Sequence, residues 1–222
     1  LTISIVDALS DDDFDAVANQ TVTATTTDND VAGFTIAQTG GSTSVAETGT
    51  TDTFTIVLNA QPDSDVVLAI TSNDTGEATV TSSLTFTNAN WNTAQTVTVT
   101  GVDDNLIDGN ISSSITISII DAVSDDHFDS VANQTVTATT TDNDVAGFTI
   151  AQTGGSTSVA ETGTTDTFTV VLNAQPASNV VFAISSSDTG EATVTSLLTF
   201  TNANWNTAQT VTVTGVDDNL ID

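Results

Sequence analysis

One long run of sequence occurs twice in the chain, and this internal repeat constrains the fold more than any other feature. The run VANQTVTATTTDNDVAGFTIAQTGGSTSVAETGTTDTFT begins at Val17 and again at Val131. The offset between the copies is therefore 131 − 17 = 114 residues. A fixed period indicates that each copy folds into the same structural unit. We expect a complete unit over residues 31–144, the C-terminal part of a preceding unit over 1–30, and the N-terminal part of a following unit over 145–222.

The partial units at the two ends allow two interpretations. The chain is an excerpt of a longer array of repeats, or copies of it join head to tail so that strands of one copy complete a sheet of the next. We favour the excerpt of a long array or fibre. Under either interpretation, neither partial unit should be stable without the strands that complete it.

Alternation of apolar and polar residues predicts seven strands in the complete unit. In residues 53–59, for example, Phe54, Ile56 and Leu58 fall on one face. Seven strands in a unit of this length are typical of an Ig-like, Greek-key β-sandwich, so the predicted fold class is all-β, with sandwiches in tandem. The expected strands cover about 33–47 (with a kink at Gly40–Gly41), 53–59, 65–71, 78–87, 95–101, 111–121 and 131–141.

The charge of the chain is extreme, because it has 29 Asp and Glu residues and no Lys or Arg. Every carboxylate must therefore find water, a backbone N–H or a metal cation. A large negative charge repels itself and speaks against nucleic acid or an anionic membrane as a partner. No apolar run approaches the roughly 20 residues of a membrane helix, so we expect no membrane insertion. Oxygen-rich acidic sites suit hard ions such as Ca²⁺; a solubilising acidic surface is the alternative.

The order of the strands places several acidic loops together. If successive strands alternate in direction, the loops after the first, third, fifth and seventh strands lie at one pole, provided that the kink at Gly40–Gly41 does not reverse the first strand. Ca²⁺ takes about six to eight oxygen ligands, so several of these loops must converge to bind it. Loops that splay into water are the alternative. The best candidate ligands are Glu47, Asp74, Asp103, Asp104, Asp108, Asp142 and Asp144.

The complete unit resembles the Calx-β family in the segments SVAETGTTDTFTIVLN, LTFTNANWNTAQTVTVTGVDDNLIDGN and TTTDND. The family is a seven-stranded sandwich that binds Ca²⁺ at one distal pole, through an early Glu, the acidic loop between the fifth and sixth strands, and the terminal acidic stretch. Asp108, Asn110 and Asn143 depart from the family pattern, which implies fewer ions or weaker affinity. The ligands that the resemblance implies are Glu47, Asp103, Asp104, Asp108, Asp142 and Asp144 in the complete unit, Glu161, Asp217, Asp218 and Asp222 in the following unit, and Asp28 and Asp30 in the preceding fragment.

Bacterial members of the family occur in long repeats of secreted adhesins and surface proteins, which implies an extracellular location here. The sequence thus predicts a structural Ca²⁺-binding repeat that acts as a calcium-rigidified spacer or fibre subunit, with neighbouring repeats or head-to-tail copies as its partners. The alternative is an adhesin module that recognises a glycan or a host protein. Its candidate residues are Trp91 and Trp205, although packing against the core or a turn is favoured for both. We expect no enzyme activity, because His127 is the only His and no catalytic set accompanies it.

Overall fold

The computed structural model describes residues 1–217, in which the protein is all-β as predicted. The chain forms two compact units, one over Leu1–Val31 and a second that begins at Ala32. None of the helices among the described residues is long and apolar enough to cross a lipid bilayer.

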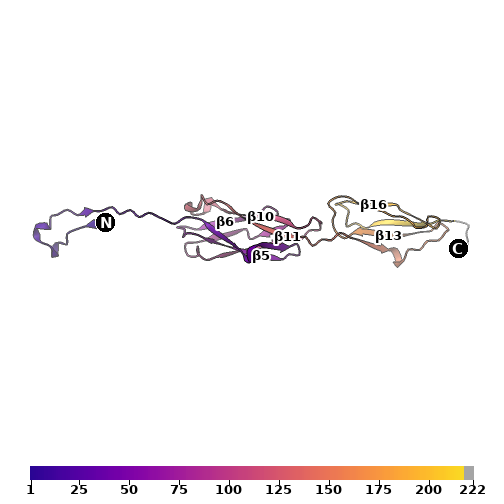
Figure 1. Cartoon of the computed structure of the whole chain (residues 1–222), viewed down its shortest axis with the longest axis horizontal. Helices are drawn as coiled ribbons and strands as arrows, with labels where there is room; N and C mark the ends of the chain where they lie inside the picture. Colours follow the sequence, from indigo (N-terminus) through magenta and orange to yellow (C-terminus); the bar gives the residue numbers. More distant parts are fainter. Residues whose placement is uncertain (218–222) are drawn as a thin grey trace. The chain divides into compact units, whose positions relative to one another are not determined.

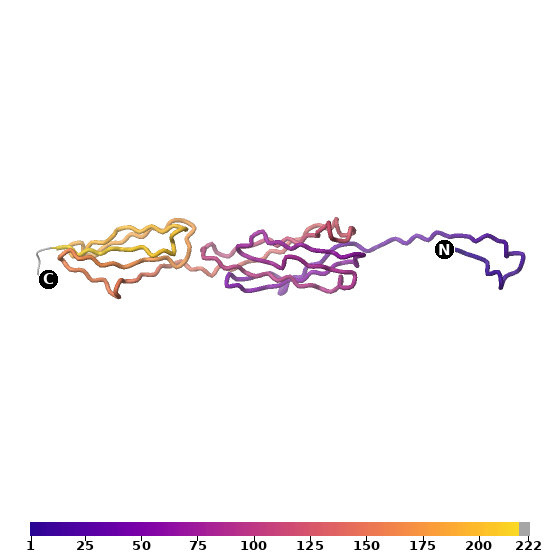
Figure 2. Tube along the Cα trace, turned by 180° about the vertical axis from the view of Figure 1, so that it is seen from behind, coloured from indigo at the N-terminus to yellow at the C-terminus, as the bar shows by residue number. Residues whose placement is uncertain are grey.

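The first unit is an open hairpin, drawn in indigo in Figure 2. Its strands β1 (Thr2–Ile3) and β2 (Gln20–Thr21) pair antiparallel, and the short 3-10 helices η1 (Asp7–Leu9) and η2 (Asp12–Phe14) lie in the loop between them. A single layer has no opposite layer against which to bury its apolar face. The large apolar side chains of this unit are therefore exposed, namely Leu1, Ile3, Ile5, Val6, Leu9, Phe14, Val17, Val22 and Val31.

The second unit begins with a sandwich of two sheets, to which the strands β5, β6, β10 and β11 labelled in Figure 1 belong. We call it the middle sandwich. One sheet has the order β4-β11-β10-β6-β8 and the other β3-β5-β9-β7. The strands are β3 (Phe34–Gln38), β4 (Thr43–Ala46), β5 (Thr51–Leu58), β6 (Val66–Ser72), β7 (Ala78–Val80), β8 (Ser83–Phe86), β9 (Gln95–Gly101), β10 (Ile111–Ile119) and β11 (Gln134–Thr141).

Two of the seven predicted strands are each divided between the sheets, so the middle sandwich has nine strands rather than seven. The expected strand over 33–47 becomes β3 and β4, and the one over 78–87 becomes β7 and β8. Gly40 and Gly41 adopt φ values of 69° and 86°, which favour glycine and let the chain step from one sheet to the other. The step does not reverse the chain. Gln38, at the end of β3, lies opposite Phe54 of β5. Ala46, at the end of β4, lies further in the same direction, because its N–H donates to the hydroxyl of Thr50, just before β5.

The predicted alternation builds the core of the middle sandwich. Phe54, Ile56 and Leu58 of β5 are buried together, as are alternate residues of the neighbouring and facing strands. The last strand, expected over 131–141, begins only at Gln134, because the 3-10 helix η5 (Asp126–Phe128) is followed by a turn and irregular residues up to position 133. Phe128 in that helix is buried and closes the core.

The remaining residues form a second, less complete sandwich, which we call the C-terminal region. One sheet has the order β12-β13-β17-β15, as in the corresponding part of the middle sandwich, and the other contains only β14 and β16. Its core is correspondingly small and centres on Phe200 and Val211. The strands are β12 (Phe148–Gln152), β13 (Thr165–Leu172), β14 (Val180–Ala183), β15 (Ala192–Val194), β16 (Leu197–Phe200) and β17 (Gln209–Gly215).

Candidate metal centre

The parallel pairing of β4 with β11 brings two acidic segments to one end of the middle sandwich. Ala46 pairs with Thr141, so Glu47 and the 142–144 stretch leave the sheet side by side. The N–H of Glu47 donates to the carbonyl of Thr141, and the N–H of Asn143 donates to Glu47 Oε2 at 3.1 Å. The sequence prediction that these segments share a pole is therefore correct.

A glycine brings the third acidic segment to the same place. β9 ends at Gly101, where a Cβ atom would lie 2.1 Å from the carbonyl oxygen of Ala46. No other residue fits so close to a backbone, and this approach carries the 102–110 loop over Glu47. Within the loop, the N–H of Leu106 donates to Asp104 Oδ1 at 2.7 Å, which fixes the turn around Asp104.

Five carboxylates converge at this end, and we call them the acidic pole. Oxygens of Glu47, Asp104 and Asp144 lie within 4.8 Å of one another, and so do oxygens of Glu47, Glu77 and Asp108. Glu47 belongs to both groups. A cation at bonding distance from several oxygens fits spacings of this size, since Ca²⁺–oxygen distances are about 2.3–2.6 Å.

Burial makes the negative charge of the acidic pole costly. The exposed fraction is 1% for Glu47 and 6% for Glu77. Burial raises the pKa of both carboxyl groups, and the negative charges of neighbouring residues raise each pKa further. Burial and the Asp142 carboxylate likewise raise the pKa of Asp144. Because the chain has no Lys or Arg, no such side chain can neutralise this cluster.

Two oxygens of the acidic pole lack a hydrogen-bond partner although they are buried. They are Glu77 Oε2 and Asp144 Oδ2. A buried acceptor without a partner costs about 1–3 kcal/mol, and more when it is charged. A hard divalent cation bonded to both groups would satisfy these oxygens and offset the repulsion, so the residues present fit such an ion.

Other predicted ligands build the loops around the acidic pole. Asp142 accepts the N–H of Asp144 at 2.7 Å and that of Gly109 at 2.9 Å, and these bonds lower the pKa of Asp142. Asp103 accepts the side-chain amide of Asn143 at 2.9 Å. Asp74 is exposed and accepts the N–H of Gly76. These three residues lie near the pole but belong to neither group of converging oxygens.

The predicted ligands outside the middle sandwich do not converge among the described residues. Asp28 and Asp30 are exposed in the first unit, where the N–H of Asp30 donates to Asp28. Glu161 is half-buried and Asp217 is exposed, and neither belongs to a group of converging oxygens. Asp218 and Asp222 lie outside the described residues.

Sequence reasoning missed Glu77 as a candidate ligand. Strand order placed the loop that contains Glu77 at the correct pole, but Asp74 was chosen from that loop. The main chain at Glu77 is fixed because its carbonyl accepts the N–H of Val102 and the hydroxyl of Thr140, and the Glu77 side chain is buried there. Alternation offered no signal for this, because a residue next to the buried Ala78 would be expected on the opposite face, yet Glu77 and Ala78 are both buried.

The two tryptophans pack against the cores, as favoured from the sequence. Trp91 lies against the core of the middle sandwich, and its carbonyl accepts the N–H of Leu58 at 3.1 Å. Trp205 has the same role in the C-terminal region, where its carbonyl accepts the N–H of Leu172.

No protein-family model and no curated protein matches the chain. Similar solved structures include CBD12 from CALX1.2, which is 14% identical with a TM-score of 0.36, and the match covers 84% of this chain and 76% of that one. Domains 1–6 of the surface layer protein SbsC are 18% identical with a TM-score of 0.38, and the match covers 90% of this chain but 24% of SbsC. SSP-19, an MSP-domain-like protein of Caenorhabditis elegans, is 17% identical with a TM-score of 0.31, over 46% of this chain and 92% of SSP-19. At these identities the likeness concerns the β-sandwich fold alone, so function must be argued from the site.

Proposed function

We propose that the acidic pole binds Ca²⁺ and that the chain is a structural, calcium-stiffened module of an extracellular or cell-surface protein. The observation that carries this proposal is the convergence of five carboxylates, two with unpartnered buried oxygens, in a chain without Lys or Arg. The ligand set is all oxygen, without Cys or His. Such a set suits hard cations, and a cluster of flexible carboxylates suits Ca²⁺ better than Mg²⁺, which demands a near-ideal octahedron.

The sharing of Glu47 between the two groups supports a pair of adjacent ions. Glu47 contributes an oxygen to the group with Asp104 and Asp144 and to the group with Glu77 and Asp108. An ion in each group would tie β4 to β11 through the first group, and the 77 and 102–110 segments through the second. The bound pole would then be rigid, which is the property required of a spacer or fibre subunit. Extracellular calcium modules bind with Kd of about 10⁻⁴–10⁻³ M, and Ca²⁺ at that level is found outside cells.

Thermal unfolding with and without Ca²⁺ tests the proposal. At a Ca²⁺ concentration of about 100 times Kd, binding should stabilise the fold by about 2.7 kcal/mol. For a domain of the size of the middle sandwich, this stabilisation corresponds to a rise in Tm of about 10 °C relative to EDTA. Mg²⁺ at the same concentration should give a clearly smaller rise.

Two variants make the test specific to the acidic pole. Glu77→Gln removes a charge that only the structure places in the site, and it should reduce the Ca²⁺-dependent rise in Tm by at least half. Asp63→Asn, on the loop between β5 and β6, is the matched control and should leave the rise unchanged. A Tm that is the same in EDTA and in saturating Ca²⁺ would remove the proposal.

A further inference from the structure

The 102–110 loop of the acidic pole contains the only Asp–Gly pair of the sequence, Asp108–Gly109. An aspartate followed by glycine can react with its own main chain. The glycine nitrogen attacks the side-chain carboxyl carbon, and a five-membered succinimide ring forms. Glycine favours this reaction because it has no Cβ atom to hinder the attack and because it reaches the required main-chain conformations at little cost. Asp108 is therefore a candidate for covalent modification as well as for metal binding.

The structure leaves room for ring closure at this pair. Asp108, Gly109 and Asn110 are exposed and lie between β9 and β10, outside both strands. Gly109 has a φ of 75°, and no atom beyond its chain neighbours lies within 4 Å of the position that a Cβ atom would occupy. A ring can thus form without displacing a packed side chain.

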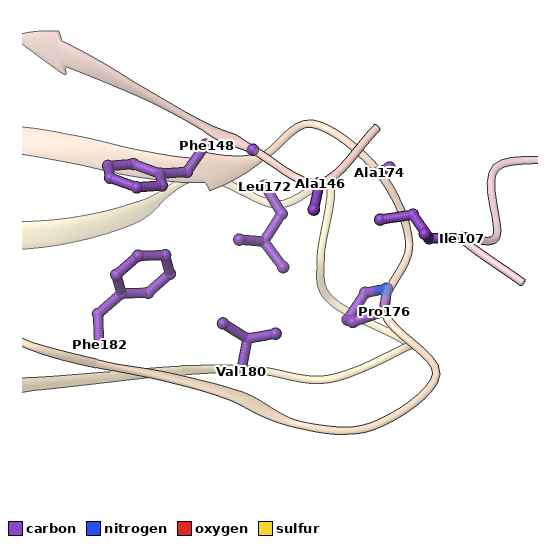
Figure 3. A pocket seen from close by; sticks show the side chains of 9 residues that line it. Ile107, Ala146, Phe148, Leu172, Ala174, Pro176, Val180 and Phe182 are labelled. Atoms are coloured by element: carbon purple, nitrogen blue, oxygen red, sulfur yellow. The ribbon is translucent and has the colours of Figure 1, made fainter. Parts of the chain in front are cut away.

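The main chain directly before Asp108 is anchored. Ile107 lines an apolar pocket together with Ala174 and Pro176 (Figure 3). Its N–H donates to the carbonyl of Gln175 at 3.4 Å. These contacts hold residue 107 in place, so that the rotation needed for ring closure is confined to Asp108 and the residue that follows it.

A carboxylate already contacts the hydrogen that the reaction must remove. The N–H of Gly109 donates to Asp142 Oδ2 at 2.9 Å. The nitrogen loses this proton when it attacks, and a base within hydrogen-bond distance of the proton is what general base catalysis requires. Asp108, Gly109 and Asp142 therefore supply the electrophile, the nucleophile and the base.

We propose that Asp108 and Gly109 close to a succinimide when the acidic pole holds no cation, and that the ring then opens to isoaspartate. The Gly109 nitrogen forms a bond to Cγ of Asp108, and its proton passes to Asp142 Oδ2. The bond between Cγ and the carboxyl hydroxyl of Asp108 breaks, and the hydroxyl leaves with that proton as water. A second water molecule adds to the main-chain carbonyl carbon of the ring and breaks its bond to the nitrogen. The main chain then runs through the former side chain.

A bound cation should suppress this reaction, because it holds the oxygens of the Asp108 carboxylate and prevents one of them from leaving. This protection rests on the proposed calcium function, whereas ring closure without a cation does not. Isoaspartate lengthens the main chain by one atom and displaces the carboxylate of residue 108. The group formed with Glu47 and Glu77 is then lost. The acidic pole would keep a permanent record of the time that it has spent without calcium.

Solvent labelling tests the proposal, because opening of the ring adds one oxygen atom from water. The full chain is kept in EDTA for several weeks, below its Tm, in water enriched in heavy oxygen. It is then digested in ordinary water for mass spectrometry. The label at residue 108 should exceed that at Asp63–Ser64, where the serine N–H also donates to a carboxylate, at 2.8 Å, but the serine has a Cβ atom. No excess at residue 108 would overturn the proposal.

Two variants, compared in EDTA, test the base. Asp142→Asn keeps an oxygen that accepts the Gly109 N–H but is a far weaker base. It should slow labelling by about 100-fold, the lower end of the usual contribution of a positioned base. Asp103→Asn is the matched control, because Asp103 accepts the side-chain amide of Asn143 at the same pole, and it should label at the wild-type rate. Equal rates in the two variants would overturn the role of Asp142.

Asp108→Glu tests the ring itself. The longer side chain disfavours a five-membered ring, so the label at residue 108 should disappear although the charge is kept. A label that persists would show that it does not arise from ring opening.

Labelling in Ca²⁺ separates this proposal from the calcium proposal. At about 100 times Kd only about 1% of the protein is free, so labelling should slow by about 100-fold. Labelling that is equally fast in EDTA and in Ca²⁺, with a Tm that rises in Ca²⁺, would overturn the protection alone. Labelling in EDTA with a Tm that does not respond to Ca²⁺ would remove the calcium proposal and leave the modification standing.

The modified protein provides the last test. After incubation in EDTA, the isoaspartate form should have lost at least half of the Ca²⁺-dependent rise in Tm, as expected for Glu77→Gln. A rise equal to that of fresh protein would overturn the loss of the site.

Discussion

At the scale of single residues, Asp125 shows how a carboxylate is stabilised here without any Lys or Arg. It is 3% exposed and fastens the loop before β6 to the segment before β11. The pKa of Asp125 is lowered to about 2, first by the N–H of Ser64 and then by the N–H and the ring of His127 and the N–H of Asp63, against the cost of burial. Backbone N–H groups thus lower the pKa of the buried Asp125, whereas in the acidic pole burial and neighbouring carboxylates outweigh them and raise the pKa of Glu47, Glu77 and Asp144.

Asp125→Asn should destabilise the middle sandwich by about 2 kcal/mol at pH 7, because a pKa lowered from 3.8 to about 2 corresponds to that free energy. The pKa is lower in the folded state, so the stabilisation is complete above about pH 4 and is lost as the pH falls through about 2. Urea unfolding in EDTA at pH 7 and at pH 2 checks both values, with Asp126→Asn as the control. An equal cost at both pH values would contradict the assignment to charge.

At the scale of strands, alternation of apolar and polar residues predicted correctly which side chains face the core. Phe54, Ile56 and Leu58 are buried as expected, because a period of two fixes which side chains face inward. Alternation does not reveal which sheet a strand joins. The divisions at Gly40–Gly41 and between Val80 and Ser83 were therefore not predicted, although the two glycines marked the first.

The acidic pole, like the strands, could be predicted from the sequence only in part. Strand order placed the acidic loops at one pole, but it could not say which carboxylates turn inward. Glu77 and Asp74 lie in one loop at the same pole, but Glu77 is buried, with its carbonyl bonded to Val102 and Thr140, whereas Asp74 is exposed and accepts the N–H of Gly76.

Gly101→Ala tests the close approach of β9 to β4. The new methyl group would meet the Ala46 carbonyl oxygen at 2.1 Å, so the strands must separate. We expect a loss of about 2–3 kcal/mol in the free energy of unfolding, at the upper end of the usual cost of overpacking. Thr79→Ala, on an exposed position of β7, should cost much less. Denaturant unfolding measures both, and a neutral Gly101→Ala would show that the approach is not required.

At the scale of the whole molecule, 29 acidic residues with no Lys or Arg leave repulsion largely unopposed. Salt screens this repulsion, since the Debye length falls from about 30 Å at 0.01 M to about 3 Å at 1 M. In EDTA, the Tm should therefore rise steadily with NaCl. Tetramethylammonium chloride should act similarly, because screening does not require an ion that enters the acidic pole. A Tm that is flat or falls with both salts would contradict this account.

The parallel pairing of β4 with β11 has a mechanical consequence. These strands lie near the beginning and at the end of the middle sandwich, so a pull on the two ends of the chain draws them along each other in opposite directions. The hydrogen bonds between β4 and β11 are then loaded in shear and must break together, instead of breaking one after another. Glu47 follows β4 directly and Asp144 lies three residues after the end of β11, so an ion bound by both would hold the two strands together at this end. A chain built this way is suited to carry tension.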